Sequence, residues 1–295
     1  MRRYVLTITC PDRVGIVAAV TGLIASRDGS VLEAAQHGDL ATGRFFLRIE
    51  IVADSLPPGF GPAELAAAFE PVADEFRMDW HLTDTNVPKR VVILASKEDH
   101  CVADLLYRWR SGELECDIPC VISNHEDLRG LVEWHGVCFH SVPFPTAGAT
   151  GADPDPAAKA AAFDRIERLA TSERADVMVL ARFMQILPAT LTAPRAGRII
   201  NIHHSFLPSF AGARPYHQAF ERGVKLIGAT CHYVTAELDE GPIIEQDTRR
   251  IDHADSPEEL RRGGRDVERT VLARGLRWHL EDRVLLNGNK TVVFP

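Results

Sequence analysis

Residues 90–96 read RVVILAS, a continuous apolar run that is typical of a strand buried on both faces of a sheet. Similar runs follow at 118–123 (IPCVIS), 176–181 (DVMVLA), 198–202 (RIINI) and 228–234 (GATCHYV). Stretches with the helical period separate several of these strands, so strands alternate with helices. This alternation predicts an α/β domain with a doubly wound, mostly parallel sheet.

The rest of this domain is less regular. Helices are expected at 100–110, at 157–171 in an alanine-rich stretch, and at 256–279 in a long amphipathic one. A short strand at 137–142 precedes an irregular loop at 143–156 (PFPTAGATGADPDP), and a short β-strand ending at 291–294 closes the chain. Whether the loop is a lid or a tolerated insertion is left open.

The pattern changes before residue 84. Strands are expected at 4–10, 30–36, 43–52 and 77–83, and helices at 14–27 and 63–76, the second interrupted near Pro71. The order βαββαβ is that of a ferredoxin-like, split-βαβ domain. A short polar segment separates the two patterns, so we predict a first domain at 1–84, a linker at 85–89 and a second domain at 90–295.

The composition is that of a soluble globular protein, with 45% hydrophobic and 25% charged residues. The formal net charge is −8, of which −5 falls in residues 1–86. No electropositive face is therefore expected, and no nucleic-acid partner. No apolar run approaches the ~20 residues that span a membrane, and no apolar signal core follows Arg2 and Arg3. These features predict a cytoplasmic protein without a membrane partner.

A dense group of polar side chains at 201–209 (NIHHSFLPS) follows one of the buried strands. Asn201 and His203 stand two residues apart on an extended segment, so both side chains emerge on the same face. Ligands of open α/β sheets bind outside the carboxyl ends of the strands. A second polar site at 238–242 (LDEGP), past the last apolar run, supplies the carboxylate of Asp239. We therefore predict that an amide, an imidazole and a carboxylate converge on one pocket.

Each element alone has a plainer interpretation. His203 alone fits a structural core histidine, and Asp239 alone fits a solvated turn. His203 and His204 are poor metal ligands as a pair, because adjacent residues on a strand face opposite ways. The chain has no HExxH motif, and its six cysteines form no CxxC pair, so we expect reduced thiols and neither metal nor cofactor. The joint pattern favours the functional interpretation.

Four stretches carry a family resemblance: Asn201-Ile-His203, 205–208 (SFLP), 228–234 (GATCHYV) and 238–246 (LDEGPIIEQ). Together they resemble the folate-dependent formyltransferase family, whose catalytic domain fits roughly 88–295. The resemblance implies that the catalytic residues are Asn201, His203 and Asp239. It also implies that the folate pocket is lined on the pteridine side by Phe183, Met184, Gln185, Ile186 and Leu187, and on the other side by Thr235, Ala236 and Glu237.

Departures from other members indicate the branch of the family. Residues 96–100 (SKEDH) have two carboxylates and no glycine, unlike the Gly-rich phosphate loop of glycinamide ribonucleotide formyltransferases. The extra basic C-terminal domain of methionyl-tRNA formyltransferases is not expected here either. Residues 203–210 (HHSFLPSF), 212–216 (GARPY) and 223–230 (GVKLIGAT) are instead similar to formyltetrahydrofolate deformylases.

The N-terminal region carries a second resemblance. Residues 12–17 (DRVGIV) look like the first turn of an ACT domain, a small βαββαβ module that often senses amino acids. The resemblance implies a homo-oligomer and an amino-acid effector, glycine or methionine, bound at Asp12, Arg13, Gly15 and Ile16. The alternative is that this domain only dimerises the enzyme.

The resemblance to deformylases implies hydrolysis of 10-formyltetrahydrofolate to tetrahydrofolate and formate, which supplies formate for purine synthesis and balances the one-carbon pool. The folate is then the substrate, and no cofactor is implied. One alternative is a formyltransferase acting on an amine, which would release no formate in the absence of an acceptor. Another is an amino-acid-binding regulatory protein with a degenerate catalytic half, against which the intact trio argues. The role of His204 is left open.

Overall fold

The computed structural model of the chain describes residues 2–145, 155–208 and 215–295. Contacts divide the chain into two compact units. The first unit consists of Met1–Pro88, Glu281–Asn287 and Thr291–Pro295, and the second of Lys89–Leu280 and Gly288–Lys290. Most of the loop expected at 143–156 lies outside the described residues.

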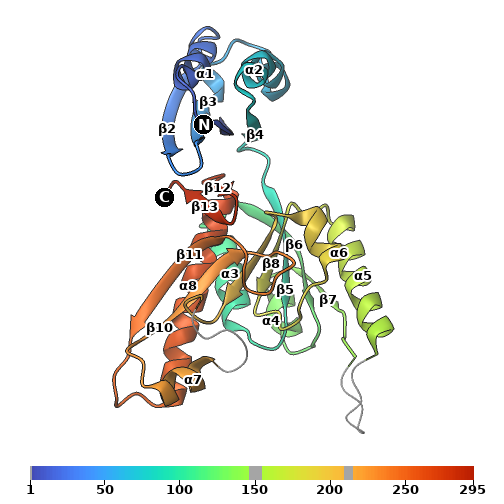
Figure 1. The fold of residues 1–295 in the computed structure, drawn as a ribbon. Coiled ribbons are helices and arrows are strands. Elements are labelled where there is room, and N and C mark those ends of the chain that lie inside the picture. The colour runs from blue at the N-terminus through green and yellow to red at the C-terminus, as the bar shows by residue number, and fades with distance from the viewer. Residues whose placement is uncertain (1, 146–154, 209–214) are drawn as a thin grey trace. The chain divides into compact units, whose positions relative to one another are not determined.

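The first unit has the βαββαβ order that the sequence predicts (Figure 1). Its elements are β1 (Arg3–Pro11), α1 (Ile16–Ala25), β2 (Ser30–Asp39), β3 (Arg44–Val52), the 3-10 turn η1 (Ala53–Ser55), α2 (Pro62–Phe76) and β4 (Asp79–Asp84). The strands form one antiparallel sheet in the order β2-β3-β1-β4. Alternate residues of β1 and β3, such as Ile8 and Leu47, share one buried cluster with Ile16 of α1 and Phe69 of α2. The alternation arises because successive strand side chains point to opposite faces.

Both helices differ from expectation at a glycine or a proline. Helix α1 begins only at Ile16, because Gly15 has φ 99°, a left-handed conformation that favours glycine. Helix α2 continues through Pro71, where an interruption was expected. Proline removes one helical hydrogen bond, but buried residues on both sides of it, including Phe69 and Phe76, keep the helix on the sheet.

The last strands of the chain, β12 (Val284–Asn287) and β13 (Lys290–Val293), form a two-stranded sheet. Most of their residues group with the first unit, whereas the sequence pattern places all of 90–295 in one domain. Phe46 of β3 is fully buried against Leu285 and Phe294 of this C-terminal segment. The antiparallel ACT-like sheet therefore has apolar contacts on both faces, which local periodicity does not reveal.

A buried arginine lies on the same face as Phe46. Arg48 is only 2% exposed, and its guanidinium donates two hydrogen bonds to the carbonyl oxygen of Glu281, at 3.2 and 3.1 Å. It also pairs with the carboxylates of Glu33 at 2.9 Å and Glu50 at 3.2 Å. A buried charge must be satisfied in this way to avoid a large desolvation cost. The C-terminal segment is thus an integral part of the first unit.

Phe294→Ala tests this packing. Removing a buried aromatic ring is expected to lower the free energy of unfolding of the first unit by about 3 kcal/mol. Leu286→Ala, in the same segment but with a half-exposed side chain, is expected to cost less than about 1 kcal/mol. Both losses of unfolding free energy are measured by urea titration, with hydrogen exchange of peptides from β3 as the readout. Equal, small losses for the two variants would show that the segment is not part of this core.

The second unit contains the predicted α/β domain. Its elements are β5 (Lys89–Ala95), α3 (His100–Ser111), β6 (Cys116–Ser123), α4 (Arg129–Trp134), β7 (Cys138–Ser141), α5 (Pro156–Ser172), β8 (Val177–Ala181), α6 (Ala189–Thr192), η2 (Ala193–Arg195), β9 (Ile199–His203), α7 (Pro215–Arg222), β10 (Leu226–Tyr233), β11 (Ile243–Arg250) and α8 (Pro257–Leu280). Its sheet has the order β11-β10-β9-β8-β5-β6-β7. The five strands from β9 to β7 are mutually parallel, which confirms a mostly parallel sheet.

The two remaining strands differ from expectation. Strand β10 runs antiparallel to β9, and β11, which the sequence pattern does not predict, pairs antiparallel with β10 at the edge of the sheet. Only part of β11 is buried, and its sequence, IIEQDTRR, has polar and charged residues where it is exposed. An edge strand of this kind has no continuous apolar run to mark it. The antiparallel direction of β10 matters because it determines which residue of β10 lies opposite each residue of β9.

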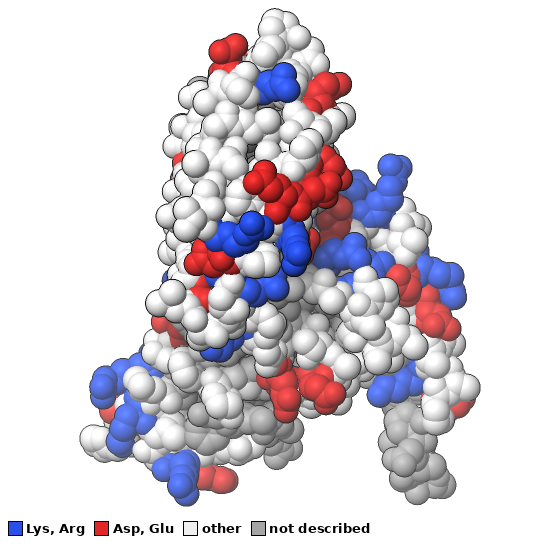
Figure 2. Space-filling view, turned by 45° about the horizontal axis from the view of Figure 1, so that its top comes forward, with Lys and Arg blue, Asp and Glu red and all other residues white. Residues whose placement is uncertain are grey.

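Helices pack on the sheet of the second unit. Phe163 and Ile166 of α5 share a buried cluster with Met178, Leu180 and Ile199 of the sheet, while α3 and α8 contact each other (Figure 1). On the surface, basic and acidic side chains are interspersed on the face shown in Figure 2. Within the described residues, no helix is both long enough and apolar enough to cross a bilayer.

Candidate active site

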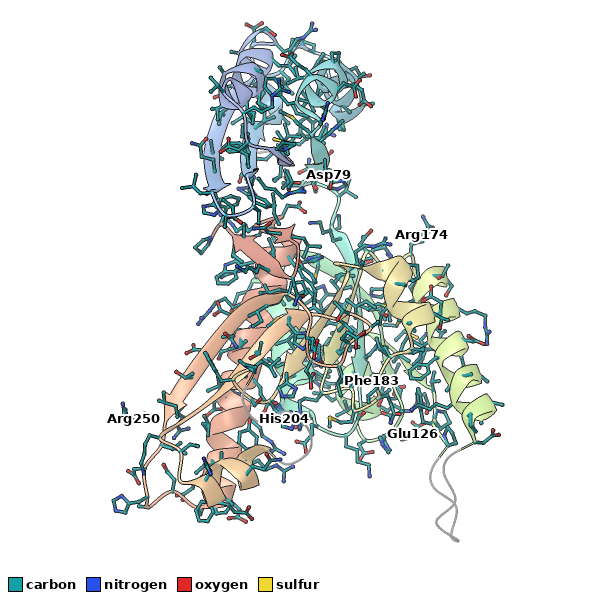
Figure 3. The ribbon with its side chains drawn as sticks, in the orientation of Figure 1. Asp79, Glu126, Arg174, Phe183, His204 and Arg250 are labelled. Carbon is teal, nitrogen blue, oxygen red and sulfur yellow. The ribbon has the colours of Figure 1, made fainter. Side chains whose placement is uncertain are left out.

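A pocket opens where β8 and β9 end in the second unit, and its volume is about 230 Å³. Phe183 follows β8 and His204 follows β9, and both are labelled in Figure 3. The lining comes from four segments: Leu180 with 182–187, 201–204, His232, and 234–239. The prediction that ligands bind beyond the carboxyl ends of parallel strands agrees with this position.

Three polar side chains meet on one face of neighbouring strands. Asn201 and His203 are two residues apart on β9, so both point to the same face. The antiparallel register places His232 of β10 opposite Asn201, and Thr230 opposite His203. The imidazole of His232 therefore joins the amide and the imidazole that the sequence predicts.

Asp239 reaches this face because the chain folds back after β10. The backbone N–H of Tyr233 donates to the carbonyl of Pro242 at 2.9 Å, which closes the loop between them. A Cβ atom on Gly241 would lie 1.8 Å from the carbonyl oxygen of Tyr233, so only glycine permits this close approach. Asp239 itself has φ 57°. Its Oδ1 lies 3.2 Å from Nδ1 of His203, and the predicted trio is thereby assembled.

The electrostatics of the trio favour an ionised carboxylate. Burial by itself raises the pKa of Asp239, but the hydrogen bond from His203 and the electrostatic influence of the nearby imidazoles bring that pKa below its usual value. Because a carboxylate only accepts, Nδ1 of His203 is the donor to Asp239. The other ring nitrogen, Nε2, is buried and has no hydrogen-bond partner within the described residues. A buried, unpaired imidazole nitrogen in a pocket is a group prepared to contact a ligand.

Comparison with known proteins agrees with this geometry. A family model for formyl transferase matches residues 89–276, and a model for the ACT domain matches residues 4–59. Formyltetrahydrofolate deformylase from Corynebacterium sp. (strain P-1) is 46% identical over 99% of this chain and 98% of its own length. The same-named protein of Bacillus subtilis (strain 168) is 48% identical over 98% of this chain and 93% of its own.

Solved structures extend the comparison to the fold. The crystal structure of a formyltetrahydrofolate deformylase from Pseudomonas syringae pv. tomato str. DC3000 is 59% identical, with a TM-score of 0.94 over 100% of this chain and 95% of that one. The chain belongs to the formyltetrahydrofolate deformylase family. Glycinamide ribonucleotide transformylase 1 from Symbiobacterium toebii is 29% identical, with a TM-score of 0.63 over 70% of this chain and 95% of that one. The deformylase family thus shares a fold with this transformylase over about two thirds of the chain.

His232 is the site residue for which the sequence analysis gives no role. Asn201 donates through Nδ2 to Nε2 of His232 at 3.1 Å, and Nδ1 of His232 donates to the carbonyl of Tyr233 at 2.9 Å. Burial lowers the pKa of His232, so its ring is neutral and Nε2 is free to accept. The arrangement fixes the orientation of the Asn201 amide. Only the antiparallel register of β10 would have predicted it.

The segment after β9 is held in place by Thr230, which is fully buried. The hydroxyl of Thr230 donates to the carbonyl of Ser205 at 2.9 Å and accepts the N–H of Leu207 at 3.0 Å. Gln246 donates to the same hydroxyl at 2.9 Å and to the carbonyl of Leu207 at 3.1 Å. These motif residues thus support the turn that follows His203. Residues 209–214, which also belong to the resemblance, lie outside the described part of the chain.

His204 also lines the pocket. Its ring lies 5.2 Å from that of His203 and 6.1 Å from that of Tyr216, measured between centroids. Burial, and then the charge of Arg182, lower the pKa of His204 to about 3. The ring is therefore neutral near neutral pH, which excludes it as a source of positive charge in the pocket.

All eight residues that the resemblance assigns to folate contacts line this one pocket. They are Phe183, Met184, Gln185, Ile186, Leu187, Thr235, Ala236 and Glu237. Met184 and Ile186 are among the exposed large apolar residues of the protein, whereas Phe183 and Leu187 are buried. The structure thus brings the two groups together around the trio, while their contact with a folate stays a prediction.

A metal site does not coincide with the trio. Among the described residues, the group of potential ligands that lies close enough to hold an ion is His100, Cys101 and Glu268, whose ligand atoms fall within 4.8 Å of one another. Glu268 already interacts there with an arginine, a histidine and a tyrosine. The expectation that the enzyme needs no metal or cofactor stays a prediction.

The candidate effector residues of the first unit have local structural contacts. Arg13 donates to the carbonyl of Glu75 at 3.1 Å and lies over the ring of Phe76, and Ile16 is buried in the core. Gly15 provides the left-handed turn before α1, and the N–H of Asp12 bonds to the carbonyl of Gly43. The side chain of Ile16 is thus not available to a ligand, so any effector contact at this residue involves its backbone.

Gly241→Ala tests the fold-back of the active-site loop. An added Cβ would clash with the carbonyl of Tyr233, so Asp239 is expected to move away from His203 and kcat to fall by about 10²-fold. Gly223→Ala is a control outside this loop, because its Cβ meets no atom within 4 Å, although its φ of 66° adds modest strain. Formate release measures kcat for both. Full activity of the Gly241 variant would show that the loop tolerates the side chain.

Proposed function

We propose that this chain hydrolyses 10-formyltetrahydrofolate to tetrahydrofolate and formate at Asn201, His203 and Asp239. Relatives named formyltetrahydrofolate deformylase match it over almost its whole length, and the proposed reaction is the one that their name states. The observation that carries the proposal is the pairing of Asp239 with the buried His203 at 3.2 Å inside a pocket. That pairing leaves an imidazole nitrogen free to act on a ligand.

The reaction needs three things: attack by water on the formyl carbon, stabilisation of the oxyanion, and a proton for the departing N10. The new bond joins the water oxygen to the formyl carbon, and the C–N10 bond breaks with its electron pair going to N10. One proton of the water ends on N10, and the other is lost when formic acid ionises. The side chains of the trio suit these steps.

Asn201 and His203 stabilise the oxyanion. One N–H of the Asn201 amide is held by Nε2 of His232, which leaves the second N–H for the formyl oxygen. His203, when protonated on Nε2, donates to the same oxygen or to N10. Losing one such donor commonly lowers the rate by about 10²–10³-fold.

Asp239 supports the imidazolium form of His203 and acts on the water. Its carboxylate accepts Nδ1–H of His203, so a proton taken up at Nε2 is stabilised by a neighbouring negative charge. The same carboxylate is ionised, because its pKa is lowered, and it is therefore able to orient the water or to take its proton. A hydrolase differs from a transferase only in that water, rather than an amine, reaches the formyl carbon.

The ACT domain gives this enzyme a candidate regulatory unit. We propose that glycine or methionine binds at the turn formed by residues 12–16, in a homo-oligomer. Dimerisation alone is the competing role. A cytoplasmic location, a reaction without metal or cofactor, and the supply of formate to purine synthesis also stay predictions.

Asp239→Asn tests the proposed chemistry. The variant keeps the size of the side chain but loses the charge, so kcat for formate release is expected to fall by at least about 10²-fold, while folate binding changes little. Glu240→Gln, which neutralises the adjacent and exposed carboxylate, is expected to keep native kcat. Formate is measured with no amine acceptor present, and folate binding by calorimetry.

Two outcomes would contradict the proposal. Near-native turnover by the Asp239 variant would remove the carboxylate from the mechanism. A wild-type enzyme that releases no formate until an amine is added would be a transferase instead.

A further inference from the structure

An arginine outside the catalytic trio lines the same pocket. Arg182 is the first residue after β8, directly before the predicted folate-contact segment, and its side chain is 13% exposed. Its backbone has φ 63°, in the left-handed region that a residue with a Cβ rarely adopts. Such strain at a pocket is maintained by the surrounding structure and often accompanies a functional role.

A buried carboxylate forms an ion pair with this arginine. Glu268 of α8 is 1% exposed, and its Oε2 lies 3.4 Å from Nε of Arg182, an ion pair in which Nε forms no hydrogen bond. The other oxygen of Glu268 accepts the hydroxyl of Tyr216 at 2.5 Å, and Oε2 also lies 2.8 Å from Nε2 of His100. Burial by itself raises the pKa of Glu268, but His100, Arg182 and Tyr216 bring it below its usual value. Glu268 is thus an ionised anchor.

The anchor is itself fixed by close packing. A Cβ atom on Gly264, one turn before Glu268 on α8, would lie 2.1 Å from the hydroxyl oxygen of Tyr216. Tyr216 therefore lies directly against the backbone of α8, and its hydroxyl has little freedom to leave Glu268. The guanidinium of Arg182 is consequently held at one edge by groups that cannot easily move.

The other edge of the guanidinium is unused. Within the described residues, Arg182 forms no hydrogen bond, and its one ion pair joins Nε to Glu268, although the residue lines the pocket. After burial, its positive charge also lowers the pKa of His204, which lines the same pocket. The wall of the pocket that contains His203 thus includes a positive charge whose terminal amino groups have no partner among the described residues.

We propose that Arg182 binds the formate that hydrolysis produces, through the free amino groups of its anchored guanidinium. This inference rests on the proposed function. Hydrolysis differs from transfer to an amine in the charge of its product, because formate is an anion whereas a formylated amine is a neutral amide. Formate forms next to the carboxylate of Asp239, which repels it. A guanidinium presents two parallel donors that match a carboxylate, so Arg182 offsets this repulsion.

The test compares formate with formamide, which is neutral and nearly the same size. Dissociation constants come from the 13C NMR line widths of the labelled compounds titrated with the full-length protein, so no turnover is needed. Arg182→Met is expected to weaken formate binding by about tenfold or more and to leave formamide binding unchanged. Arg182→Gly is expected to do the same, and glycine suits the left-handed backbone, so this variant controls for misfolding.

Arg174→Met is the matched control. Arg174 also has a left-handed backbone, with φ 51°, but it is exposed and outside the pocket (Figure 3). Its variant is expected to bind formate as the wild type does. Native formate affinity in both Arg182 variants would overturn the assignment, and so would equal weakening for formamide. If the wild type binds formate through Arg182 but releases none from 10-formyltetrahydrofolate, the proposed function fails separately.

Discussion

The candidate active site depends on a close contact between two backbone segments. Gly241 lies so near the carbonyl of Tyr233 that a Cβ would sit 1.8 Å from its oxygen, and this contact turns the chain back after β10. The turn brings Asp239 to within 3.2 Å of His203, although 36 positions separate them in the sequence. Without the contact, the carboxylate would follow β10 away from the end of β9. An amide and an imidazole would remain, but the imidazole would lose its charged partner.

The direction of β10 determines a second contact on which the site depends. Because β10 is antiparallel to β9, His232 stands opposite Asn201 and accepts one of its amide protons. The neutral ring of His232 thus orients the amide, while the ionised Asp239 orients the ring of His203. The two proposed donors for the oxyanion are held by different partners, one neutral and one charged. Preorganised donors of this kind need no rearrangement when charge develops on the substrate.

Part of this arrangement was accessible from the sequence. Asn201 and His203 alternate on a strand whose apolar run is unmistakable, and family motifs identified Asp239. The partner of Asn201 was not accessible, because apolar periodicity shows that 228–234 is a strand but not which way it runs. Edge strand β11 is too polar to stand out, and the contact of Phe46 with Phe294 joins residues nearly a chain length apart. No sequence pattern indicated Arg182, because its proposed role depends on the carboxylate of Glu268, far away in the sequence.

The most direct test is a crystal structure of the enzyme with a folate analogue whose formyl group cannot be hydrolysed. The account requires the formyl oxygen to lie about 3 Å from both Nδ2 of Asn201 and Nε2 of His203. It also requires a water between the formyl carbon and the carboxylate of Asp239. A bound analogue whose formyl group faces solvent, or lies beyond reach of His203, would contradict the central claim.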